Sequence, residues 1–423
     1  MTDEGSTPPP VTRAQVLGVT LGNALEFYDF LVFSFFAVQI GQCFFPATNP
    51  HSSLLLALAT FGAGFLTRPI GAVVIGGLGD RIGRRPMMLL SFAMIGLSTL
   101  GVAITPSYAA IGIAAPIIVI LCRLVQGFAL GGEVGTSTAF LAEAAPAAKR
   151  GTYISMQYAG QGASTLLAGA IGVGLAASMN DSALASWGWR IAMAVGVTIV
   201  PVGLVLRGRL PETLHATVSA TKAPRVRSYA GVAIFAFLTM LSATVCTYVL
   251  NYMTTFAKAT LGMPSGVALG ATVAVGAGNL VGALIGGVMS DRHGRRPWMI
   301  WPMLVFTVAA LPGFWLLTRY PSAATLYGVS FVLRMLCSIA ATSALVAVAE
   351  ALPARVRSGA LAILYAVAIS VFGGTTQFVI AWLTGVTGNP LAPAWYMFAA
   401  AVLGLVAMAF ARETAPAKAI ASA

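Results

Sequence analysis

The chain has 423 residues with a net charge of +12; 58% of the residues are hydrophobic and only 9% are charged, and the mean hydropathy is +0.87. A soluble domain carries about 25% charged residues and a disordered chain lacks apolar surface, so both classes are excluded. Continuous apolar runs also exclude a transmembrane β-barrel, whose strands alternate apolar and polar residues over about ten positions. The composition predicts an all-α, polytopic membrane protein.

Twelve apolar runs follow one another along the chain, and each approaches or exceeds the roughly 20 residues of a membrane-spanning helix. In chain order they cover residues 14–44, 53–78, 87–105, 110–140, 152–178, 187–206, 229–257, 265–289, 298–318, 322–349, 358–386 and 394–411. The polar start of the chain lacks the basic region of a secretory signal, so we expect the first run to stay in the membrane.

The basic residues are distributed unevenly between the two sides of this predicted bundle. With the N-terminus inside, 18 of the 24 Lys and Arg residues fall in the cytoplasmic segments. Only Arg190, Lys258 and Arg319 fall outside, and three more arginines lie within apolar runs. This positive-inside pattern predicts that both termini are cytoplasmic. The excess charge therefore points to anionic lipid head groups and not to nucleic acid.

The chain contains an internal repeat with an offset of 211 residues. The pattern G-x-x-x-D-R-x-G-R-R begins at Gly76 and again at Gly287, and Arg123 maps onto Arg334 at the same offset. Several charged features in one register predict two homologous six-helix halves, which in transporters of this kind rock about a midplane site. The predicted units are an N-terminal bundle at 1–206, a cytoplasmic linker at 207–227 and a C-terminal bundle at 228–423.

The paired loops resemble the signature loop of the major facilitator superfamily. Residues 22–30, 68–71 and 388–396 further resemble the metabolite:proton symporter family, whose carriers take citrate, tricarballylate, 2-oxoglutarate, shikimate, proline or betaine. Residues 123–128 and 187–190 are most similar to the citrate/tricarballylate branch. The resemblance implies the major facilitator fold of twelve helices in two pseudo-symmetric halves, and a functional monomer.

The repeated loops are predicted to form a cytoplasmic gate. Each loop places an aspartate at the end of a helix, where neighbouring arginines can form charge-assisted hydrogen bonds. A role in topology alone is the alternative, but it requires neither the aspartates nor Gly83 and Gly294, which suit a turn with unusual backbone angles. The candidate gating residues are Asp80, Arg81, Arg84, Asp291, Arg292, Arg295, Glu143 and Glu350.

Six ionisable residues stand out within the apolar runs, where a charged side chain costs roughly 2.5–3.5 kcal/mol. They are Glu26, Asp29, Arg68, Arg123, Glu133 and Arg334. At 1.5 Å per residue, Asp29 lies about 24 Å beyond Arg13 and Arg68 about 18 Å before Asp80, so both are near the midplane. A pair between Arg68 and Glu26 or Asp29 is therefore reasonable, and a purely structural ion pair is the alternative. The candidate proton-coupling residues are Asp29, Glu26, Glu133 and Arg68.

Arg123 and Arg334 are the candidate anion-binding residues. Their equivalent places in the two halves predict that both face a central cavity, and the apolar runs of the C-terminal half hold no acid for Arg334. An unpaired buried guanidinium is costly, and a substrate carboxylate would match its bidentate fork. The candidate substrate-binding residues are Arg123, Arg334, Gln157, Gln161, Tyr248, Asn251, Tyr252 and Gln377.

The charge balance predicts coupling between substrate and protons. Three acids and three arginines make the buried set neutral, so an entering polyanion favours protonation of one acid and each ligand favours the binding of the other. The sequence thus predicts a symporter that imports an organic polycarboxylate; another small metabolite of the family is the alternative substrate.

Other classes of function find less support in the sequence. We expect no enzyme, cofactor or metal site, since no H-E-x-x-H motif or nucleophile–base set is present and the four cysteines are scattered singly. A channel would not need paired gating loops, and the missing Walker A motif argues against ATP-driven transport. The predicted partners are a small organic anion, the proton and the lipid bilayer of a bacterial-type inner membrane.

Overall fold

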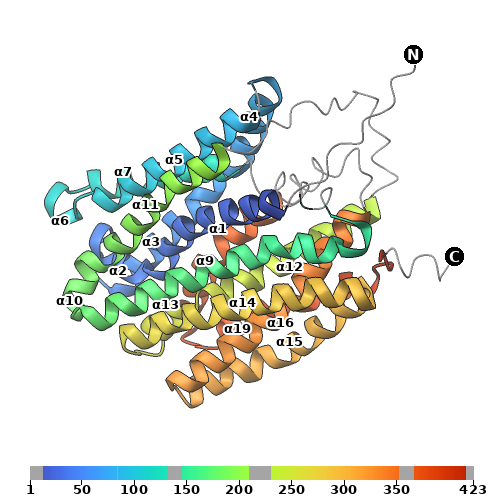
Figure 1. Cartoon of the computed structure of the whole chain (residues 1–423). Coiled ribbons are helices and arrows are strands. Elements are labelled where there is room, and N and C mark those ends of the chain that lie inside the picture. The colour runs from blue at the N-terminus through green and yellow to red at the C-terminus, as the bar shows by residue number, and fades with distance from the viewer. Residues whose placement is uncertain are drawn as a thin grey trace.

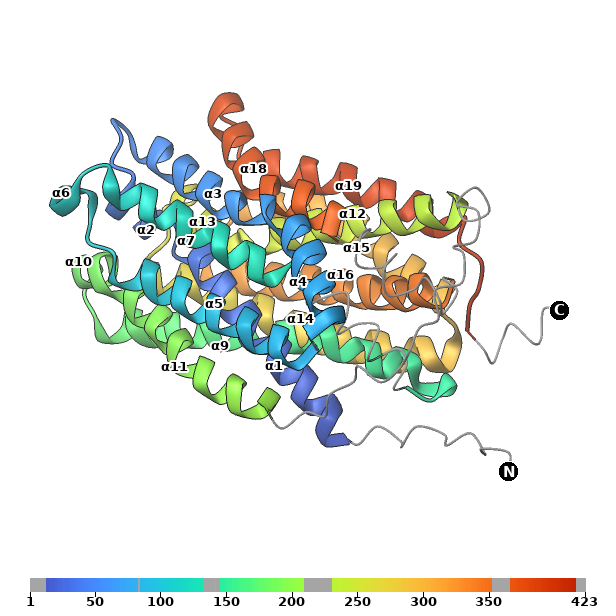
Figure 2. The ribbon, with the colours of Figure 1, turned by 90° about the horizontal axis from the view of Figure 1, so that it is seen from above.

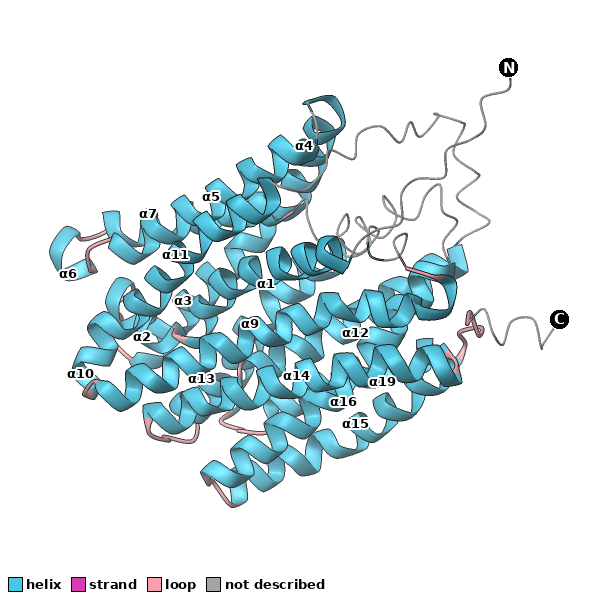
Figure 3. Cartoon of the chain, viewed as in Figure 1, coloured by secondary structure: helices cyan, strands magenta, loops and turns pink. Residues whose placement is uncertain are grey.

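A computed structural model of the chain describes residues 13–82, 84–131, 141, 145–208, 230–351 and 366–415. These residues form helices joined by short turns, and the described part of the chain contains no strand (Figure 3). A helix satisfies all of its backbone hydrogen bonds internally, which a segment surrounded by lipid requires. The predicted all-α class is confirmed.

The N-terminal part of the bundle is built from helices α1 to α11. Their bounds are α1 Arg13–Phe35, α2 Ala37–Phe44, α3 Pro50–Leu66, α4 Arg68–Ile82, α5 Arg84–Ile104, α6 Tyr108–Ile111, α7 Ala114–Leu130, α9 Arg150–Ser178, α10 Asp181–Ala183 and α11 Trp189–Gly208. A 3-10 turn at Ala147–Lys149 precedes α9, and a π-helical turn at Leu184–Gly188 precedes α11.

The C-terminal part is built from α12 to α19. Their bounds are α12 Ala230–Asn251, α13 Met253–Ala259, α14 Ser265–His293, α15 Arg295–Arg319, α16 Ala323–Ala351, α18 Gly374–Thr387 and α19 Ala392–Ala409, with a π-helical turn at Ile369–Gly373 before α18.

The lengths of these helices agree with twelve membrane spans. Within the described residues, eight helices are long and apolar enough to cross a membrane, and the bent pair α1 and α2 adds a ninth. Leu89–Ile104 in α5 and Ala114–Leu130 in α7 are shorter apolar helices, and α11 lies at the position of the remaining predicted span.

Several predicted runs are broken where the sequence suggested one helix. The first run bends by 66° between α1 and α2. The second is interrupted by a single turn residue, Thr67, between α3 and α4, and in the seventh α12 ends at Asn251 before α13 begins. Gly294, between α14 and α15, has a φ of +101°, so the expectation of a glycine-dependent turn there is confirmed. Gly83 lies outside the described residues.

The helices run roughly along one common direction, and the start of α1 and the end of α19 lie at the same end of the bundle (Figures 1 and 2). We refer to this end, which carries Asp291 and Arg295, as the basic end. The short helices α6 and α10 lie at the opposite end, which we refer to as the distal end (Figure 2). The first and the last described helices therefore have their outer ends on one side of the bundle, and the cytoplasmic location of both termini stays a prediction.

The two parts of the chain meet most closely along α9 and α14. A Cβ atom added to Gly162 would lie 2.5 Å from the backbone nitrogen of Leu280, and one added to Gly276 would lie 2.3 Å from that of Leu166. Only glycine allows the backbones to approach so closely, as in other small-residue helix contacts in membranes. This tight seam lies beside the central cavity.

Candidate functional site

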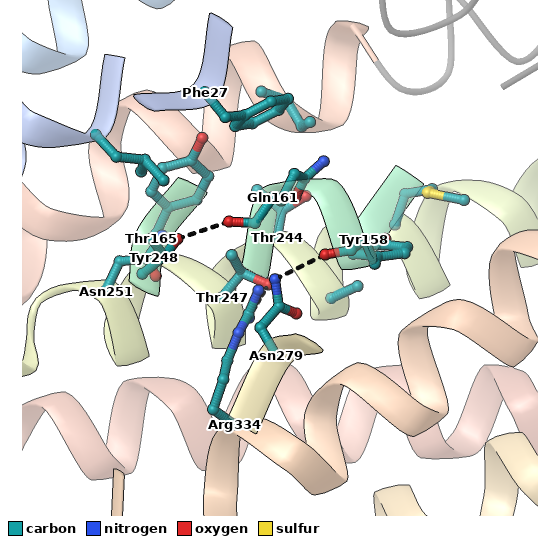
Figure 4. Close-up of a pocket in the computed structure, with 14 residues that line it drawn as sticks. Phe27, Tyr158, Gln161, Thr165, Thr244, Thr247, Tyr248, Asn251, Asn279 and Arg334 are labelled. Atoms are coloured by element: carbon teal, nitrogen blue, oxygen red, sulfur yellow. Dashed lines mark hydrogen bonds between the residues drawn. The ribbon is translucent and has the colours of Figure 1, made fainter. Parts of the chain in front are cut away.

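A central cavity lies between α1, α9, α12, α14 and α16, where the two parts of the chain meet (Figure 4). Its free volume of about 30 Å³ can hold water but is too small for a metabolite. The described structure is therefore closed around this site. The polar side chains that line it are Tyr158, Gln161, Thr165, Thr244, Thr247, Tyr248, Asn251, Asn279 and Arg334.

Arg334 is the only cation among the residues that line this cavity. Its side chain projects from α16 toward the space between Thr247 and Asn279 (Figure 4), and its Nη1 donates a 2.7 Å hydrogen bond to Thr247 Oγ1. Within the described part of the chain its Nε has no hydrogen-bond partner, and no carboxylate lines the cavity. A buried guanidinium in this setting can accept an anionic ligand.

Two other buried polar atoms at the cavity also have no hydrogen-bond partner among the described residues. Asn279 Nδ2 donates to the carbonyl oxygen of Tyr158 at 3.1 Å, which leaves Asn279 Oδ1 without a partner among the described residues. Gln161 Nε2 is likewise buried and unpaired in that set. The cavity therefore offers a cation, an amide donor and an amide acceptor to one ligand.

Arg123 lies outside the lining of this cavity, contrary to the symmetry-based expectation. Its guanidinium carbon lies 4.7 Å from the ring centre of Phe30, 4.5 Å from that of Phe33 and 5.1 Å from that of Phe61. Cation–π contacts of this kind stabilise a charge away from water. Its Nη1 also donates to Gln126 Oε1.

Asp29 is fully buried on α1 near Arg123, not beside Arg68 as the sequence suggested. Its carboxylate contacts Thr99 and packs against Gly196, where an added Cβ atom would overlap it. Thr99 Oγ1 in turn accepts a 3.0 Å hydrogen bond from Gln126 Nε2. Thr99 and Gln126 therefore connect Asp29 to Arg123 through polar side chains.

Arg68 points toward a different group of side chains. Its guanidinium carbon lies 4.5 Å from the ring centre of Phe30 and 4.1 Å from that of Phe65. Thr99 and Arg123, and not Arg68, are the groups that act on Asp29, and the alternative pair of Arg68 with Glu26 stays a prediction because the side chain of Glu26 lies outside the described residues. Tyr248 lies within electrostatic reach of Arg68 and also of Arg123 and Arg334, so it connects the surroundings of all three arginines.

Besides Arg123, three more of the predicted substrate-binding residues lie outside the cavity lining. Gln377 joins two helices, because its Oε1 accepts from Ser34 Oγ at 2.8 Å and its Nε2 donates to the carbonyl oxygen of Tyr248 at 3.3 Å. Tyr252 is buried in the apolar core at the break between α12 and α13. Gln157 is buried on α9. The structure thus places Gln161, Tyr248, Asn251 and Arg334 at the cavity and these three elsewhere.

The basic end holds a cluster of charges that joins the two parts of the chain. Arg295 Nη1 lies 2.6 Å from Asp291 Oδ1, and its Nη2 and Nε donate to the two carboxylate oxygens of Glu350 at 3.0 and 3.2 Å. Glu350 also lies 3.9 Å from Arg150 Nη1. Arg295 and Glu350, two of the candidate gating residues, are thus in direct contact, whereas Arg292 is exposed.

Asp291 also binds the start of α9, across the boundary between the two parts. Its Oδ1 accepts from the backbone N–H of Gly151 at 2.8 Å, and its Oδ2 accepts from the backbone N–H and the hydroxyl of Thr152 at 2.8 and 2.7 Å. A carboxylate at a helix N-terminus satisfies free N–H groups and the helix dipole. Asp291 therefore joins the end of α14 to the start of α9 across this boundary.

Glu413 adds a contact that the sequence analysis did not predict. Its carboxylate accepts from the backbone N–H groups of Arg295 and Arg296 at 2.9 and 3.1 Å, at the start of α15. Partial burial by itself raises the pKa of Glu413, but these bonds and those from Thr414 and Ala415 outweigh it and lower the pKa below its usual value. Thr414 Oγ1 donates to Glu350 at 2.8 Å.

Some predicted residues cannot be placed. Glu133 and Glu143 lie outside the described residues, as do the side chains of Glu26, Asp80, Arg81 and Arg84. The linker predicted at 207–227 also lies almost entirely outside them. Their proposed roles stay predictions.

Asn279, Thr244 and Thr247 were missed in the sequence analysis although all three line the cavity. Asn279 is the polar residue between Gly278 and Gly282 of α14, a spacing of glycines that is typical of close helix packing and gives no sign of a ligand. Thr247 lies four residues before Asn251 and so shares its helix face. The spacing of Thr247 and Asn251 was a signal that pointed to this cavity.

Comparison of the sequence with known proteins identifies the family of the chain. The family described as "Sugar (and other) transporter" matches residues 16–225 and 215–419. The chain is 35% identical over 402 residues to a citrate-proton symporter of Klebsiella pneumoniae, covering 93% of this chain and 90% of that protein. It is 34% identical over 397 residues to the alpha-ketoglutarate permease of Escherichia coli (92% and 91% covered) and 31% identical over 426 residues to its proline/betaine transporter (95% and 84%).

Solved structures show the same fold. The partially occluded inward-open xylose transporter XylE of E. coli superposes with a TM-score of 0.73 at 21% identity, covering 95% of this chain and 98% of that one. The same transporter bound to 6-bromo-6-deoxy-D-glucose gives 0.75 at 21% identity, with 95% and 96% covered. The protein is therefore a polytopic membrane transporter with the major facilitator fold. It belongs to the sugar (and other) transporter family and to the metabolite:proton symporters within the superfamily.

Proposed function

We propose that the protein imports an organic polycarboxylate such as citrate or tricarballylate, together with protons, by alternating access and without chemical change. The observation that carries the proposal is the buried Arg334 guanidinium at the central cavity, with a free Nε and no carboxylate lining the cavity in the described part of the chain. A substrate carboxylate supplies the missing counter-charge. Asn279 and Gln161 then bind further carboxyl or hydroxyl groups.

Proton coupling is assigned to Asp29 and its neighbours. Asp29 is buried, and Thr99 and Gln126 connect it to Arg123. A substrate anion in the central cavity disfavours a second negative charge nearby, so it promotes protonation of the carboxylate. Proton and anion then stabilise each other's binding, which is the thermodynamic requirement of symport. Glu26 and Glu133 stay alternative proton carriers.

The transport cycle requires that the two ends of the bundle open alternately. We assign the basic end to the cytoplasm and the distal end to the outside of a bacterial inner membrane, because the basic residues cluster with the termini. Release of the substrate then requires Asp291 to leave Gly151 and Thr152 at the start of α9. The protein acts as a monomer in the bilayer in this scheme.

A smaller carboxylate is the second candidate substrate. Of Arg68, Arg123 and Arg334, only Arg334 lines the cavity, and a single bidentate guanidinium is sufficient for one carboxylate. A ligand such as 2-oxoglutarate, shikimate, proline or betaine would then bind through one carboxylate, with the amides of Asn279 and Gln161 binding the rest of the molecule.

A binding panel separates the two candidates. Isothermal titration of the purified transporter with citrate, tricarballylate, 2-oxoglutarate, proline and betaine should give the tightest binding for the tricarboxylates. Arg334→Gln should weaken that binding about 10- to 100-fold, and Arg319→Gln, at an exposed helix end, should leave it intact. Binding of betaine or proline without binding of any tricarboxylate would contradict the proposal.

A further inference from the structure

A second polar contact joins the two parts of the chain at the distal end. Lys258 Nζ on α13 donates a 2.8 Å hydrogen bond to Ser265 Oγ, at the first residue of α14. Ser265 Oγ donates in turn to Asp181 Oδ1 on α10 at 3.0 Å. Lys258 and Ser265 belong to the C-terminal part, whereas Asp181 belongs to the N-terminal part. The chain of bonds therefore crosses between the parts at the end opposite to Asp291.

A small cavity lies directly at this contact. It has a free volume of about 10 Å³, and its polar lining consists of Gln39, Thr254, Thr255, Lys258 and Ser265. Gln39 comes from α2 and the other four from α13 and α14, so the cavity lies between the two parts of the chain. Four of these side chains are buried and Lys258 is half-buried. No carboxylate is among the residues that line it.

The chemistry of this lining suits a carboxylate. An ammonium group, hydroxyl groups and an amide can all donate hydrogen bonds to carboxylate oxygens, and those of the ammonium are charge-assisted. The bond from Ser265 to Asp181 shows that a carboxylate oxygen already occupies one side of the Lys258–Ser265 pair. When the distal end opens, Asp181 moves away with the N-terminal part and this position becomes free.

We propose that Lys258 and Ser265 form an outer docking site for a carboxylate of the arriving substrate, and that Asp181 occupies this site when the distal end is closed. The inference rests on the proposed function, because it takes the substrate to be an anion that arrives at the distal end. Exchange of one carboxylate for another keeps the charge around Lys258 constant. Substrate binding at the surface thus replaces the contact that Asp181 makes in the closed state.

Transport kinetics from each side test the docking site. In proteoliposomes of uniform orientation, Lys258→Gln should raise the KM for citrate presented at the distal end by about tenfold, the effect of losing one charge-assisted bond. The KM for citrate presented at the basic end should stay unchanged. Lys258→Arg should retain most of the affinity.

Asp181→Asn should lower the KM for citrate at the distal end because it removes the competing carboxylate. Ser182→Ala, which changes the exposed neighbouring residue, should leave this KM unchanged.

A second measurement reports on the contact without substrate. Thr255→Cys, in a chain whose four native cysteines are replaced by serine, should react faster with a membrane-impermeant thiol reagent when Asp181→Asn is added. An unchanged rate would contradict the role of Asp181. Normal citrate uptake with an unchanged distal KM in Lys258→Gln would overturn the docking site and leave the proposed function intact. A wild-type protein that carries no carboxylate would overturn both.

Discussion

At the scale of single residues, Arg334 determines how the cavity binds an anion. Arg334→Gln should raise the KM for the substrate about 10- to 100-fold, the range expected for the loss of hydrogen bonds to a charged group. Arg334→Lys keeps the charge but loses the planar fork, so we expect an intermediate KM. Initial uptake rates over a range of citrate concentrations give the KM of each variant. Equal KM values for wild type and Arg334→Gln would remove Arg334 from the site.

Glu413 gives the basic end a pH-dependent contribution to stability. Its folded-state pKa is lowered, so it stabilises the folded protein above the usual carboxyl pKa of about 4.3 and loses this effect as the pH falls through the folded-state pKa. Wild type should therefore unfold at a higher temperature than Glu413→Gln at pH 7, and the difference should disappear toward about pH 3. Thermal unfolding in detergent across this range measures it. A difference that persists at low pH would contradict the assignment.

The sequence repeat predicted that both Arg123 and Arg334 face the cavity. This is correct for Arg334, whereas Arg123 lies outside the cavity lining. The two positions are equivalent in the sequence repeat, yet three phenylalanines surround Arg123 and Thr247 orients Arg334. A repeat fixes the position of a side chain on its helix, whereas its neighbours on other helices decide which way it turns. The surroundings of Asp29 and Arg68 were likewise not predictable from the sequence, since Asp29 lies near Arg123 and Arg68 lies against Phe30 and Phe65.

At the scale of helices, the seam between α9 and α14 depends on glycine. Gly162→Ala would place a Cβ atom 2.5 Å from the backbone nitrogen of Leu280. Overpacking of this kind costs roughly 1–3 kcal/mol, so the unfolding temperature should fall by several degrees. Gly174→Ala on the same helix is the matched control, because nothing lies within 4 Å of its added Cβ atom. Equal unfolding temperatures for the two variants would contradict the close approach of the α9 and α14 backbones at Gly162.

The contact between α14 and α9 controls the basic end. Asp291→Asn removes the charge that accepts from Gly151, Thr152 and Arg295, so the open state should become more populated there. A cysteine at Ser155, which is fully buried near Gly287, should then react faster with a thiol reagent supplied at the basic end. Arg292→Gln changes an exposed residue of the same loop and should leave the rate unchanged. A rate that Asp291→Asn does not raise would exclude this gate.

Hydropathy predicted the number and order of the spans but not their breaks. The apolar runs continue through Phe36, Thr67 and Tyr252, although the helices bend or end there. Hydropathy depends only on composition, whereas these breaks depend on how each helix packs against its neighbours. The turn at Gly294 was predictable, because glycine reaches a φ of +101° without steric cost.

At the scale of the whole molecule, the described residues join the two parts at both ends of a central cavity that is too small for a metabolite. Asp291 bridges the two parts at the basic end, and Ser265 bridges them at the distal end. These contacts use different residues, so each end can open while the other stays closed. This is the arrangement that alternating access requires of two rocking halves.

The central claim is that the movement of a carboxylate substrate is coupled to that of protons. Liposomes containing the purified protein should accumulate radiolabelled citrate when the pH is lower outside than inside, and a protonophore should abolish the accumulation. Asp29→Asn should still equilibrate citrate across the membrane but no longer concentrate it. Citrate uptake that does not respond to the proton gradient, or no citrate uptake at all, would contradict the account.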